Sequence, residues 1–229
     1  MHIPDGFLSP AIAIITFAVT TVFWIISFRK VKNSLDESQV PIMGLLTALF
    51  FATQMMNYPI VGGTTAHLLG SASLGIILGP FAGCISMTII LALQCLLFGD
   101  GGITALGANV LNMGIIGVFI PALLLMVLSK VSKGKGLFLV WVFIAAFVGD
   151  VLSAVAAGVE LGLSVPTFQY GLSIAVPAMA INHSVIGVIE GVVTVVLIAT
   201  LLKLRPDVLS KSPVLKNVLS PDDANQAKD

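Results

Sequence analysis

Two long stretches of this chain contain no Lys or Arg, one between Lys32 and Lys130 and the other between Lys135 and Lys203. Hydrophobic residues make up 57% of the sequence and charged residues 10%, whereas about a quarter of an average soluble domain is charged. A helix that crosses a bilayer needs roughly 20 apolar residues, and both stretches are long enough for more than one. We therefore expect an all-α integral membrane protein.

The composition excludes several other classes of protein. Eleven Lys and Arg residues balance eleven Asp and Glu residues, so the chain offers no basic surface for a nucleic acid. High hydrophobicity excludes intrinsic disorder. Two cysteines without a metal-binding spacing give neither a disulfide scaffold nor a zinc site.

Proline and glycine divide the apolar sequence into a bundle of about seven transmembrane helices. The expected spans are residues 8–28, 42–56, 108–128, 137–159 and 181–202, with two shorter helices inside 67–98. We place the break between those two at Gly79–Pro80, because proline ends one helix and readily begins another; the alternative is one kinked helix. The segment 160–179, which contains two prolines, is expected to be an external loop.

The basic residues fall into three groups, which the positive-inside rule places in the cytoplasm. They are Arg29, Lys30 and Lys32; Lys130, Lys133 and Lys135; and Lys203, Arg205, Lys211, Lys216 and Lys228. Four spans between the first two groups return the chain to the same side. The N-terminus is therefore expected outside and the C-terminus inside, with one membrane-embedded domain, 1–204, and a polar cytoplasmic tail, 205–229.

Small residues recur at a spacing of four in the last two spans. They are Ala145, Gly149, Ser153 and Ala157, and then Gly187 and Gly191. In lipid such stripes allow helices to approach closely. We expect them to pack within this chain; the alternative is a docking face for another membrane subunit.

The N-terminus combines two features that suit metal chelation. It lacks the basic residues and cleavage site of a signal peptide, so Met1 is expected to be the mature first residue. The terminal amine, the backbone nitrogen of His2 and its imidazole can bind one ion through fused rings, and His67 can complete four nitrogens in a plane. Planar nitrogen coordination favours Ni²⁺ or Cu²⁺. The alternative is that a histidine at position 2 is accidental.

Four blocks of the sequence resemble the nickel/cobalt-uptake membrane components of energy-coupling-factor (ECF) transporters, of the CbiM/NikM type. They are MHIPDGFLSP at 1–10, GGTTAHLLG at 62–70, LLFGDGGITALGANVLNMG at 96–114 and NHSVIGVIEG at 182–191. The first and third blocks are long and specific. The blocks are spread from the first residue to the last expected span, so the resemblance extends over essentially the whole membrane part of the chain.

The resemblance implies a substrate-capturing (S) component with Ni²⁺, or alternatively Co²⁺, as its transported substrate. The implied metal ligands are Met1, His2 and His67, so segment 1–10 belongs to the site, and Asn182 and His183 match a family motif near it. The implied partners are a transmembrane coupling subunit, two cytoplasmic ATPases and, in some systems, a small auxiliary membrane subunit. The implied location is the plasma membrane of a prokaryote.

Three acidic residues are further candidates, because acids inside a membrane are costly and often functional. Asp150 and Glu190 fall in expected spans, where each is expected to form structural hydrogen bonds or to act in transport. Glu160 is expected to be a solvated loop residue. The glycines of 99–102 are expected to form a tight turn beside the metal pocket rather than a phosphate cradle.

Two rival functions remain open at this stage. One is a self-sufficient carrier that uses Asp150 and Glu190 for proton coupling. The other is an intramembrane hydrolase, which the missing HExxH and GxSxG motifs disfavour. The sequence also contains no nucleotide-binding motif, so we expect no ATPase activity in this chain.

Overall fold

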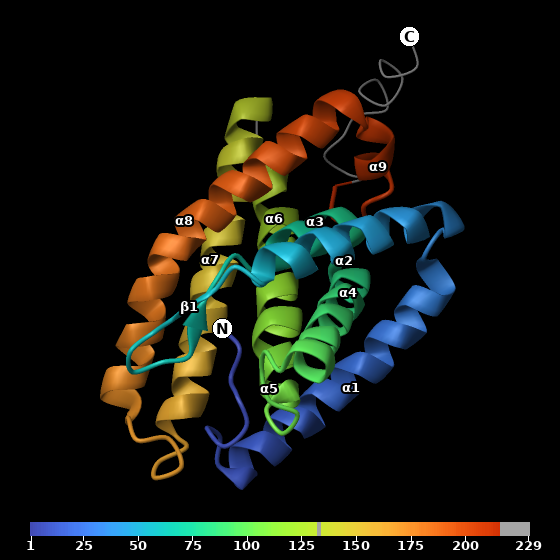
Figure 1. Ribbon diagram of the computed structural model, residues 1–229. Helices are drawn as coiled ribbons and strands as arrows, with labels where there is room; N and C mark the ends of the chain where they lie inside the picture. Colours follow the sequence, from blue (N-terminus) through green and yellow to red (C-terminus); the bar gives the residue numbers. More distant parts are fainter. Residues whose placement is uncertain (132–133, 216–229) are drawn as a thin grey trace.

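The computed structural model describes residues 1–131 and 134–215, which are mostly helical (Figure 1). The longer helices are α1 (Pro10–Ser34), α2 (Val40–Gln54), α4 (Pro80–Leu93), α6 (Gly117–Leu128), α7 (Lys135–Gly162) and α8 (Leu172–Leu204). The short helices are α3 (Ser71–Leu78), α5 (Leu106–Asn109) and α9 (Pro206–Ser210). Two segments are 3₁₀-helices, η1 (Glu37–Gln39) and η4 (Ser129–Val131). Two others are π-helices, η2 (Gln94–Phe98) and η3 (Val110–Ile116).

A hairpin with two residues in each strand interrupts this helical architecture before α3. Strand β1 (Tyr58–Pro59) pairs antiparallel with β2 (Thr65–Ala66). The residue that follows β2 is His67, so the hairpin fixes where that side chain enters the bundle.

Five helical stretches of the described residues are long and apolar enough to cross a membrane. They are Pro10–Asn33, Pro80–Phe98, Leu106–Val131, Lys135–Gly162 and Leu172–Leu204. The other two expected spans are shorter than a bilayer requires, since α2 has 15 residues and α3 has 8. The membrane-protein class and helical fold are therefore confirmed, whereas the count of seven is not.

The expected external loop at 160–179 is much shorter in the structure. Helix α7 continues to Gly162 and α8 begins at Leu172, so the prediction is wrong for both ends of the loop. Pro177 lies inside α8, within its first two turns. There its missing N–H removes only one hydrogen bond near the helix start, and the helix tolerates it.

The predicted break at Gly79–Pro80 is confirmed, because α3 ends at Leu78 and α4 begins at Pro80. Gly79 has a φ of +86°, a conformation that residues with a Cβ rarely adopt. A Cβ at this position would also lie 2.5 Å from Cγ of Pro213. Glycine is therefore required both by the backbone and by the packing of the C-terminal segment.

The small-residue stripe of α7 packs within this chain, as predicted. All four of its residues are buried. A Cβ at Gly149 would lie 2.2 Å from Cγ of Pro121 in α6. Phe143 and Phe147 of α7 lie against Gly191 and Gly187 of α8.

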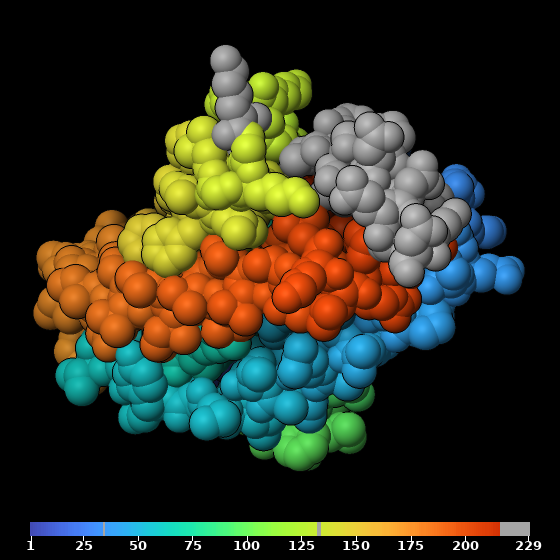
Figure 2. Space-filling view, turned by 90° about the horizontal axis from the view of Figure 1, so that it is seen from above, coloured from blue at the N-terminus to red at the C-terminus, as the bar shows by residue number. Residues whose placement is uncertain are grey.

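The described part of the C-terminal tail packs against one end of the bundle. Leu209 and Leu215 are fully buried, and the Ser212 hydroxyl donates to the carbonyl oxygen of Ile76 at 2.5 Å. The expected polar tail is thus anchored as far as residue 215, and 216–229 lie outside the described residues. Seen from this side, α8 forms a continuous band between α7 and the region of α2 and the hairpin (Figure 2).

The three groups of basic residues meet at this same end of the molecule. Nζ of Lys211 lies 3.5 Å from a carboxylate oxygen of Asp36, in the connector that follows α1. Lys130 and Val214 line one hollow. Lys133, Lys216 and Lys228 lie outside the described residues.

Candidate metal centre

The first residues of the chain run into the interior of the bundle (Figure 1). Met1 and Ile3 are fully buried and His2 is 2% exposed. Asn109 holds the segment by two hydrogen bonds, because its Oδ1 accepts from the Ile3 N–H at 2.8 Å and its Nδ2 donates to the Ile3 carbonyl at 3.1 Å. The N–H of Gly102 donates to the same carbonyl at 2.9 Å.

Asp5 closes this segment onto the loop that precedes α5. Its carboxylate accepts hydrogen bonds from the N–H groups of Ile103 and Thr104 and from the Thr104 hydroxyl. These bonds lower the pKa of Asp5, and the bond from the Thr104 hydroxyl contributes most. The loop at 99–102 therefore lies beside the N-terminus, as predicted, with Gly101 against the His2 side chain.

The two backbone nitrogens at the start of the chain share one partner, the hydroxyl of Thr65 in β2. The Met1 amine donates to Oγ1 at 2.8 Å, and the His2 N–H donates to the same atom at 3.1 Å. These are the two backbone nitrogens that a chelate at the N-terminus requires. The structure therefore brings them to one point beside the strand that leads to His67.

The imidazoles of His2 and His67 lie face to face, with ring centroids 4.5 Å apart and planes inclined by 20°. His67 Nδ1 lies 3.0 Å from the carbonyl oxygen of Leu68. Because a carbonyl only accepts, Nδ1 carries the proton and Nε2 keeps its lone pair. Within the described structure, His67 Nε2 and both ring nitrogens of His2 are buried without a hydrogen-bond partner.

Burial keeps these nitrogens free of extra protons. It lowers the pKa of the Met1 amine, of His2 and of His67 well below their ordinary values. A neutral amine and neutral imidazoles are the forms that bind a metal ion. Two carboxylates, those of Asp100 and Asp150, interact with the charge of the Met1 amine, and an Asp100 oxygen lies 3.8 Å from His2 Nε2.

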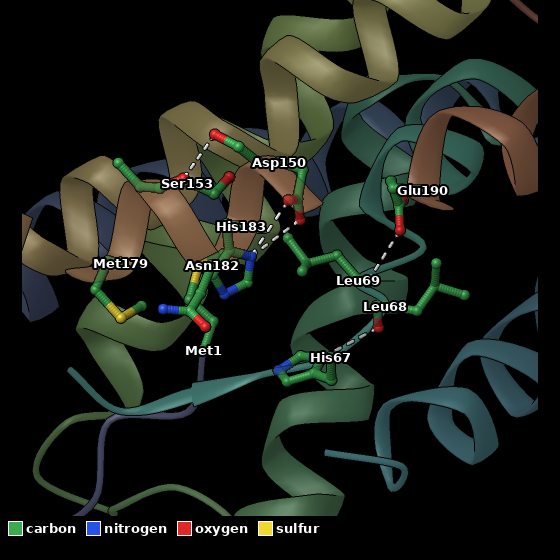
Figure 3. Close-up of polar contacts among 12 residues, drawn as sticks. Met1, His67, Leu68, Leu69, Asp150, Ser153, Met179, Asn182, His183 and Glu190 are labelled. Carbon is green, nitrogen blue, oxygen red and sulfur yellow. Dashed lines mark hydrogen bonds and ion pairs between the residues drawn. The ribbon is translucent and has the colours of Figure 1, made fainter. Parts of the chain in front are cut away.

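Helix α8 contacts the loop that carries His67 at two places, and Figure 3 shows the contact between Glu190 and Leu69. Glu190 accepts hydrogen bonds from the N–H groups of Leu69 and Gly70, at 3.0 and 3.1 Å. Two helical turns earlier, His183 Nε2 lies 3.4 Å from the carbonyl oxygen of Thr65. His67 is therefore held between two contacts from one face of α8.

Asp150 of α7 braces His183, whose Nδ1 lies 3.2 Å from a carboxylate oxygen. Both ring nitrogens of His183 therefore have partners, unlike those of His2. Glu190 contacts the loop, whereas His183 and Asp150 lie close enough to the Met1 amine to interact with its charge. Asn182 donates to the carbonyl of Ala178 in its own helix, at 2.9 Å.

The prediction for Glu160 is wrong. This residue lies in the last turn of α7, is 8% exposed and accepts a hydrogen bond from Asn112 Nδ2 at 2.6 Å. The sequence prediction ended the helix too early and therefore placed the carboxylate in water.

Sequence reasoning also missed residues that hold the site without being charged. Thr65 and Asn109 make the contacts of the N-terminal segment, yet a threonine in a loop and an asparagine in an apolar run have many possible roles. The available signal was their position inside two of the blocks singled out above, GGTTAHLLG and LLFGDGGITALGANVLNMG.

Side chains alone do not form a metal site in the described part of the chain. Residues 1–131 and 134–215 contain no group of three or more His, Cys, Asp or Glu side chains arranged to hold an ion. The donors that converge at the N-terminus are two imidazoles and two backbone nitrogens. Such a set can hold a divalent transition metal ion through nitrogen atoms.

Comparison with known proteins also relates this chain to proteins of transition-metal transport. Residues 2–208 match the family described as cobalt uptake substrate-specific transmembrane region, CbiM. The chain is 39% identical to a putative fused nickel transport protein, NikMN, of Archaeoglobus fulgidus, over 92% of this chain and 68% of the relative. It is 32% identical to the cobalt transport protein CbiM of Thermosipho melanesiensis, over 89% and 87% of the two chains.

A solved structure has the same fold. The crystal structure of a truncated transition metal transporter superposes with a TM-score of 0.84 at 39% sequence identity, covering 89% of this chain and 99% of the other.

Proposed function

This chain belongs to the CbiM family of cobalt uptake substrate-specific transmembrane regions, and on that premise we propose that it captures Ni²⁺ outside the cell for uptake. The ligands are the Met1 amine, the His2 backbone nitrogen, a His2 ring nitrogen and His67 Nε2. The observation that carries this proposal is the convergence of both backbone nitrogens on Thr65, next to the paired imidazoles.

We propose nickel rather than cobalt as the preferred ion. Four nitrogens in a plane suit Ni²⁺ better, because Co²⁺ more readily accepts other geometries. Relatives named for nickel and for cobalt both occur among the similar proteins. A competition experiment with equal concentrations of the two ions distinguishes the two substrates.

ATP-driven transport through this chain would require partners, because its sequence contains no nucleotide-binding motif. We propose an ECF-type importer, in which a transmembrane coupling subunit and two ATPases, with or without a small auxiliary membrane subunit, move the ion captured by this chain. The chain would span the plasma membrane of a prokaryote several times, with the metal centre outside. Its own residues bind the ion and catalyse no reaction.

The sharpest test moves the amine and leaves every side chain in place. One extra residue before Met1 converts the amine into an amide, so we expect bound nickel to fall from about one per chain to near zero. Intact mass must first show that Met1 is the mature N-terminus of the unextended protein.

Two controls interpret this experiment. His67→Ala should also abolish nickel loading, because it removes the fourth nitrogen. Lys32→Ala, at the opposite end of the molecule, should bind nickel as the unmodified protein does. Equal loading of the extended and native proteins would contradict the N-terminal chelate.

A further inference from the structure

The hydroxyl of Thr65 and a chelated ion require the same two nitrogen atoms. Oγ1 accepts from the Met1 amine and from the His2 N–H, at 2.8 and 3.1 Å. A hydroxyl oxygen has two lone pairs, so these bonds use its whole accepting capacity. No other side chain described in the structure accepts a hydrogen bond from either nitrogen.

An ion bound to the His2 nitrogen cannot coexist with the second of these bonds. Coordination replaces the amide proton, and the hydrogen bond directs that proton toward Oγ1. Metal–nitrogen bonds are about 2 Å long, which is most of the 3.1 Å between the nitrogen and Oγ1. The hydroxyl must turn away when the ion enters.

We propose that Thr65 is a positioning residue that stands in for the metal ion, holding Met1 N and His2 N together whenever no ion does. Ion capture then exchanges one set of bonds for another while the N-terminal segment stays in the bundle. This inference rests on the proposed chelate. It adds that the chelate is preorganised by a side chain that is not a ligand.

The backbone of Thr65 is held independently of the N-terminus. Thr65 pairs with Pro59 in the hairpin, and its carbonyl oxygen lies 3.4 Å from His183 Nε2, which Asp150 braces from the other side. A fixed backbone allows the hydroxyl to rotate about one side-chain bond without moving the loop. The His183–Asp150 pair thus acts on the site through Thr65.

The rest of the N-terminal segment does not depend on this hydroxyl. Ile3 is held by Asn109 and Gly102, and Asp5 by Ile103 and Thr104. Loss of the Thr65 hydroxyl should therefore release only Met1 and His2. The fold and the remaining segment stay in place.

The test measures how fast an amine-acetylating reagent modifies Met1 of the purified full chain, read by mass spectrometry of the N-terminal peptide. Without metal, Thr65→Val should raise this rate by about tenfold, because the isosteric side chain accepts no hydrogen bond. Thr65→Ser keeps the hydroxyl and should match the unmodified protein. Thr64→Val is the matched control, because the Thr64 hydroxyl contacts only Met179 Sδ, at 3.8 Å.

Hydrogen exchange at the Ile3 amide separates local release from misfolding, since this amide should stay protected in every variant. An unchanged acetylation rate in Thr65→Val, or an equal rise in Thr65→Ser, would overturn the inference. A rise in Thr64→Val as large as in Thr65→Val would do the same.

Nickel completes the test. It should protect Met1 in all variants and give Thr65→Val the same absorption spectrum as the unmodified protein. A different spectrum would make the hydroxyl a ligand and overturn its role as a stand-in. If nickel fails to protect Met1 of the unmodified protein, the proposed chelate itself is wrong, whatever the variants show.

Discussion

At the scale of single residues, burial prepares nitrogen donors for a metal ion. The Met1 amine and the imidazoles of His2 and His67 lie in an apolar interior, which disfavours their charged forms. The proton of His67 is fixed on Nδ1 by the Leu68 carbonyl, which leaves Nε2 to bind. Asn109 and Thr65, both uncharged, set where these donors lie.

The protonation states of these donors determine how many protons nickel binding releases. Burial lowers the pKa of the Met1 amine and of both imidazoles, which favours the neutral forms that bind a metal ion. Nickel binding at pH 7 should then release about one proton, from the His2 peptide nitrogen. Titration calorimetry in buffers of different ionisation enthalpy measures this number.

The lowered pKa values of the imidazoles also determine how nickel binding depends on pH. Protonation of the imidazoles competes with the ion only when the pH falls through their lowered pKa values. The proton displaced from the His2 peptide nitrogen still lowers the nickel affinity about tenfold for each unit of falling pH. The affinity should therefore fall with this slope down to pH 6, without the steeper loss that protonation of imidazoles at the ordinary pKa of 6.5 would cause. Release of no proton at pH 7 would remove the peptide nitrogen from the ligand set, and release of three would contradict neutral donors.

At the scale of elements, α8 and the C-terminal segment hold the short helix α3 at its two ends. Glu190 binds the N–H groups of Leu69 and Gly70 just before α3, and Ser212 binds the carbonyl of Ile76 in its last turn. All eight residues of α3 are buried. The helix therefore connects the loop of His67 to the end of the bundle where the basic groups meet.

Glu190 should act as an acceptor of hydrogen bonds rather than as a proton carrier. Glu190→Ala leaves two buried N–H groups without a partner, at a cost of about 1–3 kcal/mol each, and should weaken nickel binding. Glu190→Gln retains an accepting oxygen and should stay close to the unmodified protein in melting temperature, nickel binding and uptake. Normal binding with abolished uptake in Glu190→Gln would instead support a proton-coupled carrier.

The junction between α3 and α4 should tolerate no side chain at Gly79. Gly79→Ala combines an unfavourable φ of +86° with contact to Pro213, and strain of this kind costs about 1–3 kcal/mol. We expect a lower melting temperature in detergent. Gly44→Ala is the matched control, because a Cβ at this helical position meets nothing within 4 Å; a similar loss of stability in that variant would show that the effect is not local to the junction.

Across the molecule as a whole, the N-terminal segment that carries the proposed metal ligands enters the bundle from the end opposite the basic groups (Figure 1). The segment runs from the end where the loop between α7 and α8 lies to the middle of the bundle, whereas α9 lies at the other end (Figure 1). Near α9, Nζ of Lys211 is 3.5 Å from a carboxylate oxygen of Asp36. The positive-inside rule assigns the basic end to the cytoplasm. The centre would then face the outside, where a captured ion arrives.

Labelling of single cysteines in whole cells tests this orientation. A membrane-impermeant maleimide should modify Val61→Cys, at an 89% exposed position of the hairpin loop, in intact cells. It should modify Lys32→Cys only after the cells are permeabilised. The native Cys84 and Cys95 are buried and should stay unmodified; the reverse pattern would invert the proposed topology.

Properties that depend on a short window of residues could be predicted from the sequence alone. Apolar length predicted the five long membrane helices, proline and glycine predicted the break at Gly79–Pro80, and residue chemistry singled out His2 and His67. Clustering of the basic residues predicted that they share one end. Each of these features depends on residues that are neighbours in the sequence, so it can be predicted without knowledge of the tertiary contacts.

The way in which the site is held together depends on contacts between segments that are distant in the sequence. The Met1 amine meets Thr65, which is 64 residues away in sequence, and Leu69 meets Glu190, which is 121 residues away. Burial of Glu160 and the engagement of Asn182 within its own helix also depended on helix lengths and faces that local patterns left open. A hydrogen bond between uncharged groups leaves no periodicity in the sequence, because its partner is chosen by packing and not by neighbouring residues.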